Sequence, residues 1–93
     1  MKKYETVFIV SAKAAENELK EINEKLVRVA KQNEGQILNC QTIGRKSLAF
    51  PMKKQFDGIY YHMEYEGNKT VVSEIESSLR FDDRVLRFLT TAL

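Results

Sequence analysis

The sequence predicts an α+β sandwich, in which one four-stranded antiparallel sheet carries two helices on one face in the order β-α-β-β-α-β. Two observations predict this fold. Apolar residues alternate between strand-like and helix-like spacing in this order along the 93 residues. The composition, 43% hydrophobic and 30% charged, is that of an ordinary globular protein, so we expect a single domain over residues 1–93.

The first half of the chain contains a strand, a helix and a long extended segment. Residues 4–10 are rich in β-branched and aromatic side chains, which is typical of a central strand that is apolar on both faces. Residues 15–34 have helical periodicity, and Gly35 is expected to end this helix in the left-handed conformation. Residues 36–53 are expected to be extended, with a bulge at Gly44. Pro51 confines that strand to a sheet edge, because proline cannot donate a ladder hydrogen bond.

The second half repeats the order of strand, helix and strand. A turn is expected at residues 55–58, a strand at 59–66, and a helix at 69–80 that begins at an Asn68 cap. A short strand over residues 85–89 completes the set. Two right-handed crossovers around a central hairpin give a ferredoxin-like sandwich with the first and third strands at the centre. The sheet face without helices is expected to carry Val7, Ile9, Tyr60 and His62.

Several chemistries are excluded by the residues that the chain lacks. Cys40 is the only cysteine, so neither an internal disulfide nor a thiolate metal cage is possible. The chain has no histidine pair, and we expect no metal or cofactor. The N-terminus lacks the small-residue cleavage site of a signal peptide, and no apolar run approaches the ~20 residues of a membrane span. These observations favour a cytoplasmic protein with no membrane association.

The sequence also lacks the parts of an enzyme. The segment after the first strand, residues 11–14, has no glycine, so a backbone cradle for an anion is not expected there. His62 has no serine or second histidine nearby in the sequence and is interpreted as a half-buried packing residue. The third strand does not match the aromatic motif of sheets that stack single-stranded RNA. We therefore predict no catalytic residues.

Charge is distributed unevenly although the net charge is only +2. Residues 36–56 carry four basic and no acidic side chains, whereas residues 57–78 carry five acidic side chains and one lysine. A basic segment concentrates anionic partners. Two other functions stay open on the fold alone: a homodimeric small-molecule-sensing regulatory module, which needs a glycine-bearing loop at its interface, and acyl-phosphate hydrolysis.

Three stretches resemble a known family. They are residues 2–5 (KKYE), residues 44–52 (GRKSLAFPM) and residues 79–87 (LRFDDRVLR). Together they are similar to the sixth protein of the bacterial small ribosomal subunit, ribosomal protein S-six, and the element order agrees over essentially the whole chain. The resemblance implies a ferredoxin-like fold without catalysis, and a structural role on the ribosome in the cytoplasm. It implies binding to the central domain of small-subunit ribosomal RNA and a heterodimer with the eighteenth small-subunit protein.

The resemblance also assigns expected site residues. Arginine and lysine contacts to phosphate supply RNA affinity, and the candidates form a cationic rim: Lys2, Lys3, Arg45, Lys46, Arg80, Arg84 and Arg87. The partner protein is expected on the second strand and the open sheet face, at Val7, Ile9, Leu48, Phe50 and Tyr60. The isolated chain is expected to be a monomer.

Overall fold

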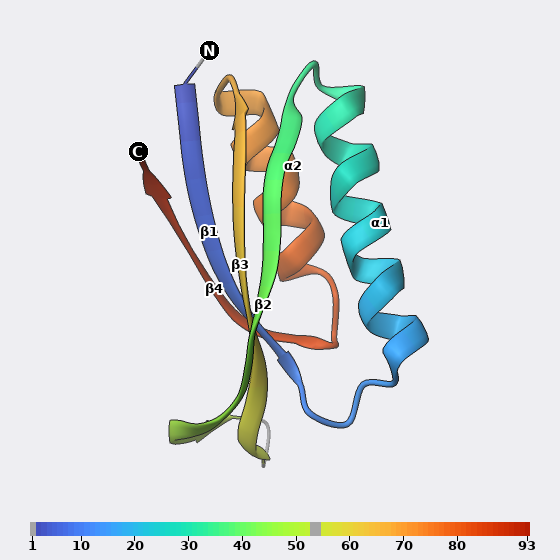
Figure 1. The fold of residues 1–93 in the computed structure, drawn as a ribbon, viewed down its shortest axis with the longest axis vertical. Helices are drawn as coiled ribbons and strands as arrows, with labels where there is room; N and C mark the ends of the chain where they lie inside the picture. Colours follow the sequence, from blue (N-terminus) through green and yellow to red (C-terminus); the bar gives the residue numbers. More distant parts are fainter. Residues whose placement is uncertain (1, 53–54) are drawn as a thin grey trace.

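The computed structural model describes residues 2–52 and 55–93, and within these ranges the side chains of residues 47–52 and 55–56 are not described. The elements follow the predicted order (Figure 1). They are β1 (Lys2–Ser11), α1 (Glu16–Gln32), β2 (Gln36–Met52), β3 (Gln55–Gly67), α2 (Lys69–Arg80) and β4 (Val85–Ala92). No helix in the described ranges is long and apolar enough to cross a membrane.

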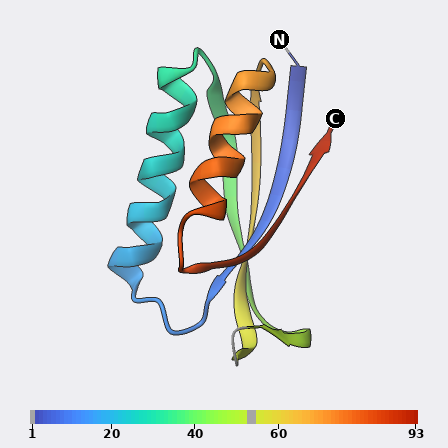
Figure 2. The same ribbon diagram turned by 180° about the vertical axis from the view of Figure 1, so that it is seen from behind.

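The four strands form one antiparallel sheet in the order β2-β3-β1-β4. This order confirms that the first and third strands are central and that the strand containing Pro51 is an edge. Both helices cover the same face of the sheet, and the opposite face is left without a covering layer (Figures 1 and 2). Helix α1 lies against the β2 side of the sheet, whereas α2 lies against the β4 side. The ferredoxin-like prediction is therefore confirmed.

The core lies between the helices and the sheet because each element turns one apolar face inward. Alternate residues of β1 and β3 point to the helices, so their apolar members are buried. The helical spacing of α1 and α2 adds three fully or almost fully buried residues from each helix. The core residues below 3% exposure are Phe8, Val10, Ile22, Leu26, Ala30, Met63, Tyr65, Val71, Ile75 and Leu79.

Local signals set several of the boundaries correctly. The Asn68 side chain accepts hydrogen bonds from the backbone N–H groups of Thr70 (3.0 Å) and Val71 (3.2 Å), which confirms the predicted cap of α2. The register of β2 shifts between Thr42 and Gly44, and Gly44 has a φ of 128°, which confirms the bulge there.

Two predictions about turns were wrong. Residues 55–58 belong to β3, and Gln55, Asp57 and Gly58 pair with β2, so the connection between the strands lies outside the described residues. At the end of α1 the left-handed residue is Glu34, with a φ of 64°, and not Gly35. Gly35 is needed for space instead: a Cβ built on it would lie 2.7 Å from Val71 Cγ2 and 2.9 Å from the Glu66 carbonyl oxygen.

This close approach makes Gly35→Ala an informative change. The added methyl group forces either Val71 or the backbone of Glu66 to move, and we expect a loss of about 1–3 kcal/mol in the free energy of unfolding. Urea denaturation measures the loss. In a Val71→Ala background, where side-chain atoms facing Gly35 are removed, the cost of Gly35→Ala is expected to be smaller. If Gly35→Ala alone has the same urea midpoint as the wild type, the close approach at Gly35 does not require a glycine.

Candidate RNA and partner interfaces

The register of the central strands decides which predicted residues share a face. Tyr4 and Phe8 point to the helices, so Lys3, Val7 and Ile9 lie on the opposite, open face. Tyr60 and His62 lie opposite Ile9 and Val7 and share that face. The predicted grouping of Val7, Ile9, Tyr60 and His62 on the open face is therefore confirmed. Leu48 and Phe50 lie among the residues whose side chains are not described.

The open face is partly apolar and partly occupied by its own side chains. Val7 and Tyr60 are half-buried, and Ile9 is only 8% exposed. Lys46 Nζ lies 5.8 Å from the centre of the Tyr60 ring, within range of a cation–π interaction. Leu89 of β4 lies opposite Val7 and is 69% exposed. Leu89 was not among the residues selected from the sequence, although alternation along a strand places it on the same face as Arg87, two residues away.

The residues of the predicted cationic rim do not form one continuous surface in the structure. Lys2 and Lys3 are neighbours in a strand, so their side chains leave it on opposite faces. Lys2 therefore lies on the helix side, whereas Lys3 lies on the open face, opposite Glu66 in the register. Arg45 Nε donates a hydrogen bond to Asp57 Oδ2 at 2.6 Å in an exposed ion pair.

Two of the predicted cations lie near the edge of the sheet formed by β4. Arg80, at the end of α2, and Arg87, in β4, line one hollow of about 300 Å³, which we call the arginine hollow. Its other lining residues are Leu79, Val85, Leu86 and Phe88. The Arg80 guanidinium carbon lies 5.8 Å from the centre of the Phe88 ring, so the aromatic side chain supports it. Both arginines are exposed, and neither forms an ion pair with any residue that the structure describes.

A break in the strand register places Arg87 on the open face. The pairing of β4 with β1 shifts between Ile9 and Val10, so Ile9 lies opposite Arg87 but Val10 lies opposite Val85. Val85 is thereby buried with Val10 on the helix side of the sheet. Arg87 lies with Ile9 on the open face, although it is only two residues from Val85. An unbroken strand would place Val85 and Arg87 on the same face.

A second hollow lies at the other end of α2. It has a volume of about 300 Å³ and is lined by Lys2, Tyr4, Gly67, Asn68 and Lys69. We call it the lysine hollow. Eleven helical steps separate Lys69 from Arg80, so the two hollows are roughly 16 Å apart along α2. Sequence reasoning missed Lys69; the signal for it is a first helical turn without an acidic residue.

Arg84 has a different place, within the fold. Its Nε donates to Asp82 Oδ1 at 2.9 Å and its Nη2 donates to Oδ2 at 2.8 Å, while Nη1 donates to Glu21 at 3.1 Å. Lys25 of α1 donates to the same Asp82 carboxylate at 2.8 Å. We call these four residues the Asp82 clamp, because they tie α1 to the segment between α2 and β4. Because its guanidinium group is occupied by these hydrogen bonds, Arg84 is not included in the RNA surface proposed below.

Burial and charge have opposite effects within the Asp82 clamp. The Asp82 side chain is 5% exposed, and burial alone raises the pKa of a carboxyl group. The hydrogen bonds from Arg84 act more strongly, and together with Lys25 they hold the pKa of Asp82 well below its usual range. Asp82 is therefore a buried carboxylate with two cationic partners, which is a structural arrangement.

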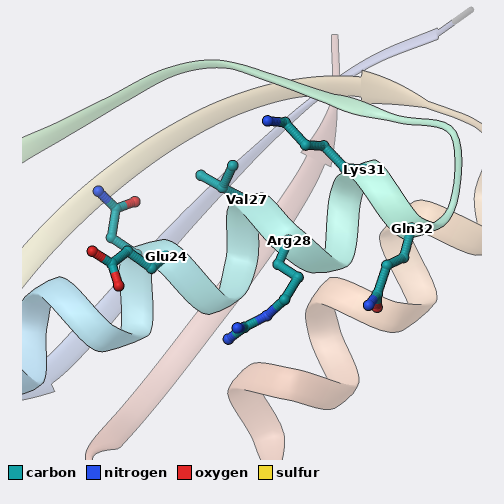
Figure 3. A pocket seen from close by; sticks show the side chains of 6 residues that line it. Glu24, Val27, Arg28, Lys31 and Gln32 are labelled. Atoms are coloured by element: carbon teal, nitrogen blue, oxygen red, sulfur yellow. The ribbon is translucent and has the colours of Figure 1, made fainter.

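The hollow along α1 and the Cys40 thiol do not form a reactive site. A hollow of about 360 Å³ along α1 is lined by Asn23, Glu24, Val27, Arg28, Lys31 and Gln32, all from one helix. Arg28 and Lys31 leave the helix in different directions there (Figure 3). Cys40 is half-buried, and burial raises the pKa of its thiol, which disfavours the reactive thiolate.

The structure thus defines a class of protein: a small ferredoxin-like domain, with the exposed Arg80 and Arg87 at one edge and an open sheet face. The model of the ribosomal protein S6 family matches residues 3–92, and the chain belongs to this family. The family consists of structural components of the small ribosomal subunit and not of enzymes.

Individual relatives agree with this assignment. The chain is 39% identical over 93 residues to the small ribosomal subunit protein bS6 of Syntrophobacter fumaroxidans and spans 63% of that protein's length. It is 37% identical over 90 residues to bS6 of Porphyromonas gingivalis, of which it covers 77%. The crystal structure of ribosomal protein S6 from Thermotoga maritima superposes with a TM-score of 0.88 at 22% identity, covering 99% of this chain and 87% of the other. That structure supports the fold.

Proposed function

We propose that this chain is a structural component of the bacterial small ribosomal subunit, in the cytoplasm, and that it binds the central domain of small-subunit ribosomal RNA with its β4 edge. The observation that carries the proposal is the arginine hollow, which Arg80 and Arg87 both line without a carboxylate partner among the described residues. Guanidinium groups suit phosphate because their fixed N–H donors match its oxygens.

The surface extends along α2 to the lysine hollow. Lys69 there lies roughly 16 Å along the helix from Arg80, and Lys2 lines the same hollow, so one stretch of RNA backbone could reach cationic groups at both ends of the helix. Lys3, Arg45 and Lys46 remain secondary candidates, since they lie on the open face or at the β2 edge. We place the eighteenth small-subunit protein on the open face, at Val7, Ile9, Tyr60 and the exposed Leu89.

The double variant Arg80→Ala/Arg87→Ala tests the RNA surface. Two phosphate contacts are lost, so we expect affinity for a central-domain RNA fragment to fall about tenfold or more, with the partner present. The slope of log affinity against log salt concentration is expected to become shallower by about 2. Filter binding over a salt series gives both quantities.

A matched variant separates the site from the loss of charge. Lys20→Ala/Arg28→Ala also removes two exposed cations, but from α1, which lies on the β2 side of the molecule (Figure 2). It is expected to retain affinity close to that of the wild type. Equal losses in both variants, or an unchanged salt slope after removal of Arg80 and Arg87, contradict the proposed RNA surface.

A further inference from the structure

Two carboxylates face each other at the centre of the open sheet face. Glu5 of β1 lies directly opposite Glu64 of β3 in the antiparallel register. His62, two residues before Glu64, shares their face, and its Nε2 lies 3.2 Å from Glu5 Oε1. One ligand atom of each of the three residues lies within 4.8 Å of the others. We call these three residues the carboxylate cluster.

This arrangement is unfavourable for the isolated chain. Like charges directly opposite each other in an antiparallel pair destabilise a sheet. The Glu5 side chain is 31% exposed, so solvent screens the repulsion only in part. His62 contacts Glu5, and Glu64 has no ion pair with any residue that the structure describes. Among the described residues, Glu64 therefore has no cationic partner that would offset its charge.

The surroundings of the cluster resemble part of a protein interface. Val7 follows Glu5 on the same face, and Leu89 lies beside Val7 with 69% of its surface exposed. An apolar strip next to paired carboxylates matches a long basic side chain, whose methylene stem covers the apolar surface while its head reaches the acids. A protein that assembles on the same RNA has an excess of arginine and lysine, because RNA affinity depends on them.

We propose that the carboxylate cluster receives an arginine side chain of the partner protein, which bridges Glu5 and Glu64 while its stem lies on Val7 and Leu89. This inference rests on the proposed function, since it describes the contact that the partner makes. An arginine suits the position better than a lysine, because its planar fork donates to two carboxylates at once. The carboxylate cluster thus favours a basic group of the partner over an acidic one at this point of the open face.

The double variant Glu5→Gln/Glu64→Gln tests the inference with two readouts of opposite sign. Partner affinity, measured by isothermal titration calorimetry with the eighteenth small-subunit protein, is expected to fall at least tenfold and to become less dependent on salt. The melting temperature of the isolated variant is expected to stay level or rise, because the facing charges have been removed. A merely structural role for the cluster predicts a lower melting temperature instead.

A matched control removes two carboxylates elsewhere. Glu16→Gln/Glu74→Gln changes exposed positions on the two helices and is expected to leave partner affinity within twofold of the wild type. Wild-type affinity in the Glu5→Gln/Glu64→Gln variant overturns the inference, even though the partner itself binds. Partner binding by the wild-type chain that requires added zinc chloride also overturns the inference, because the cluster then holds a metal ion. If the wild-type chain does not bind the partner at all, the proposed function fails first.

Discussion

Replacing Asp82 with alanine is expected to lower the free energy of unfolding by about 3 kcal/mol. The change removes the carboxylate that receives hydrogen bonds from Arg84 and Lys25, and it leaves those two cations beside each other. Removal of one partner from a buried ion pair costs about 3–5 kcal/mol, and the partial exposure of Arg84 and Lys25 favours the lower end. Guanidinium denaturation at pH 7 measures the effect, with Glu74→Ala on the exposed side of α2 as the control.

The same variant has a characteristic pH dependence. Because the partners of Asp82 lower its pKa in the folded state, its contribution to stability is complete above the unfolded value of about 3.9 and is lost as the pH falls below it. The stability difference between wild type and Asp82→Ala is therefore expected to narrow between pH 5 and about pH 2. A difference that stays constant over this range contradicts the Asp82 clamp.

Replacing Leu26 with alanine is the second change with a large expected effect, a loss of about 2–5 kcal/mol. Leu26 is completely buried at the centre of the inner face of α1, between Ile22 and Ala30. Truncation removes apolar contacts and leaves a cavity between α1 and the sheet, where the tightly packed core can relax only in part. Urea denaturation gives the loss. Lys20→Ala, on the exposed side of the same helix, is expected to change stability by less than about 0.5 kcal/mol.

The loss of stability in Leu26→Ala is not expected to change RNA affinity. Leu26 lies outside both proposed surfaces, so the folded fraction of Leu26→Ala is expected to bind RNA with wild-type affinity. RNA affinity is measured at a temperature below the unfolding transition of the variant. A tenfold loss of RNA affinity there contradicts the separation of the core from the RNA surface.

Much of the fold was predictable because its signals are local. The helical spacing around Leu26, the Asn68 cap and the bulge at Gly44 each depend on a few neighbouring residues, and the structure confirms all three. The position of the β2–β3 connection depends instead on which residues pair across the hairpin. Asp57 and Gly58 have turn composition, but the pairing of Ser47 with Asp57 keeps them in β3. Tertiary pairing overrides local preference there.

The candidate site was less predictable because it depends on contacts between distant segments. Arg84 appeared as one more free cation in the sequence, and its pairing with Glu21 joins residues 63 positions apart. The carboxylate cluster depends on the register between β1 and β3, which composition alone does not fix. Simple alternation also failed in β4, where the register shift buries Val85 and leaves Arg87 exposed.

The central claim is that RNA binds the β4 edge lined by Arg80 and Arg87, and that the partner protein binds the adjoining part of the open face around Val7 and Leu89. Amide chemical-shift mapping of the labelled chain tests it most directly, first with the partner added and then with the RNA fragment. Partner addition is expected to shift the amides of Val7, His62 and Leu89, and RNA addition those of Lys2, Arg80 and Arg87. RNA-induced shifts confined to the outer side of α1, or partner addition that leaves the open face unchanged, would contradict the account.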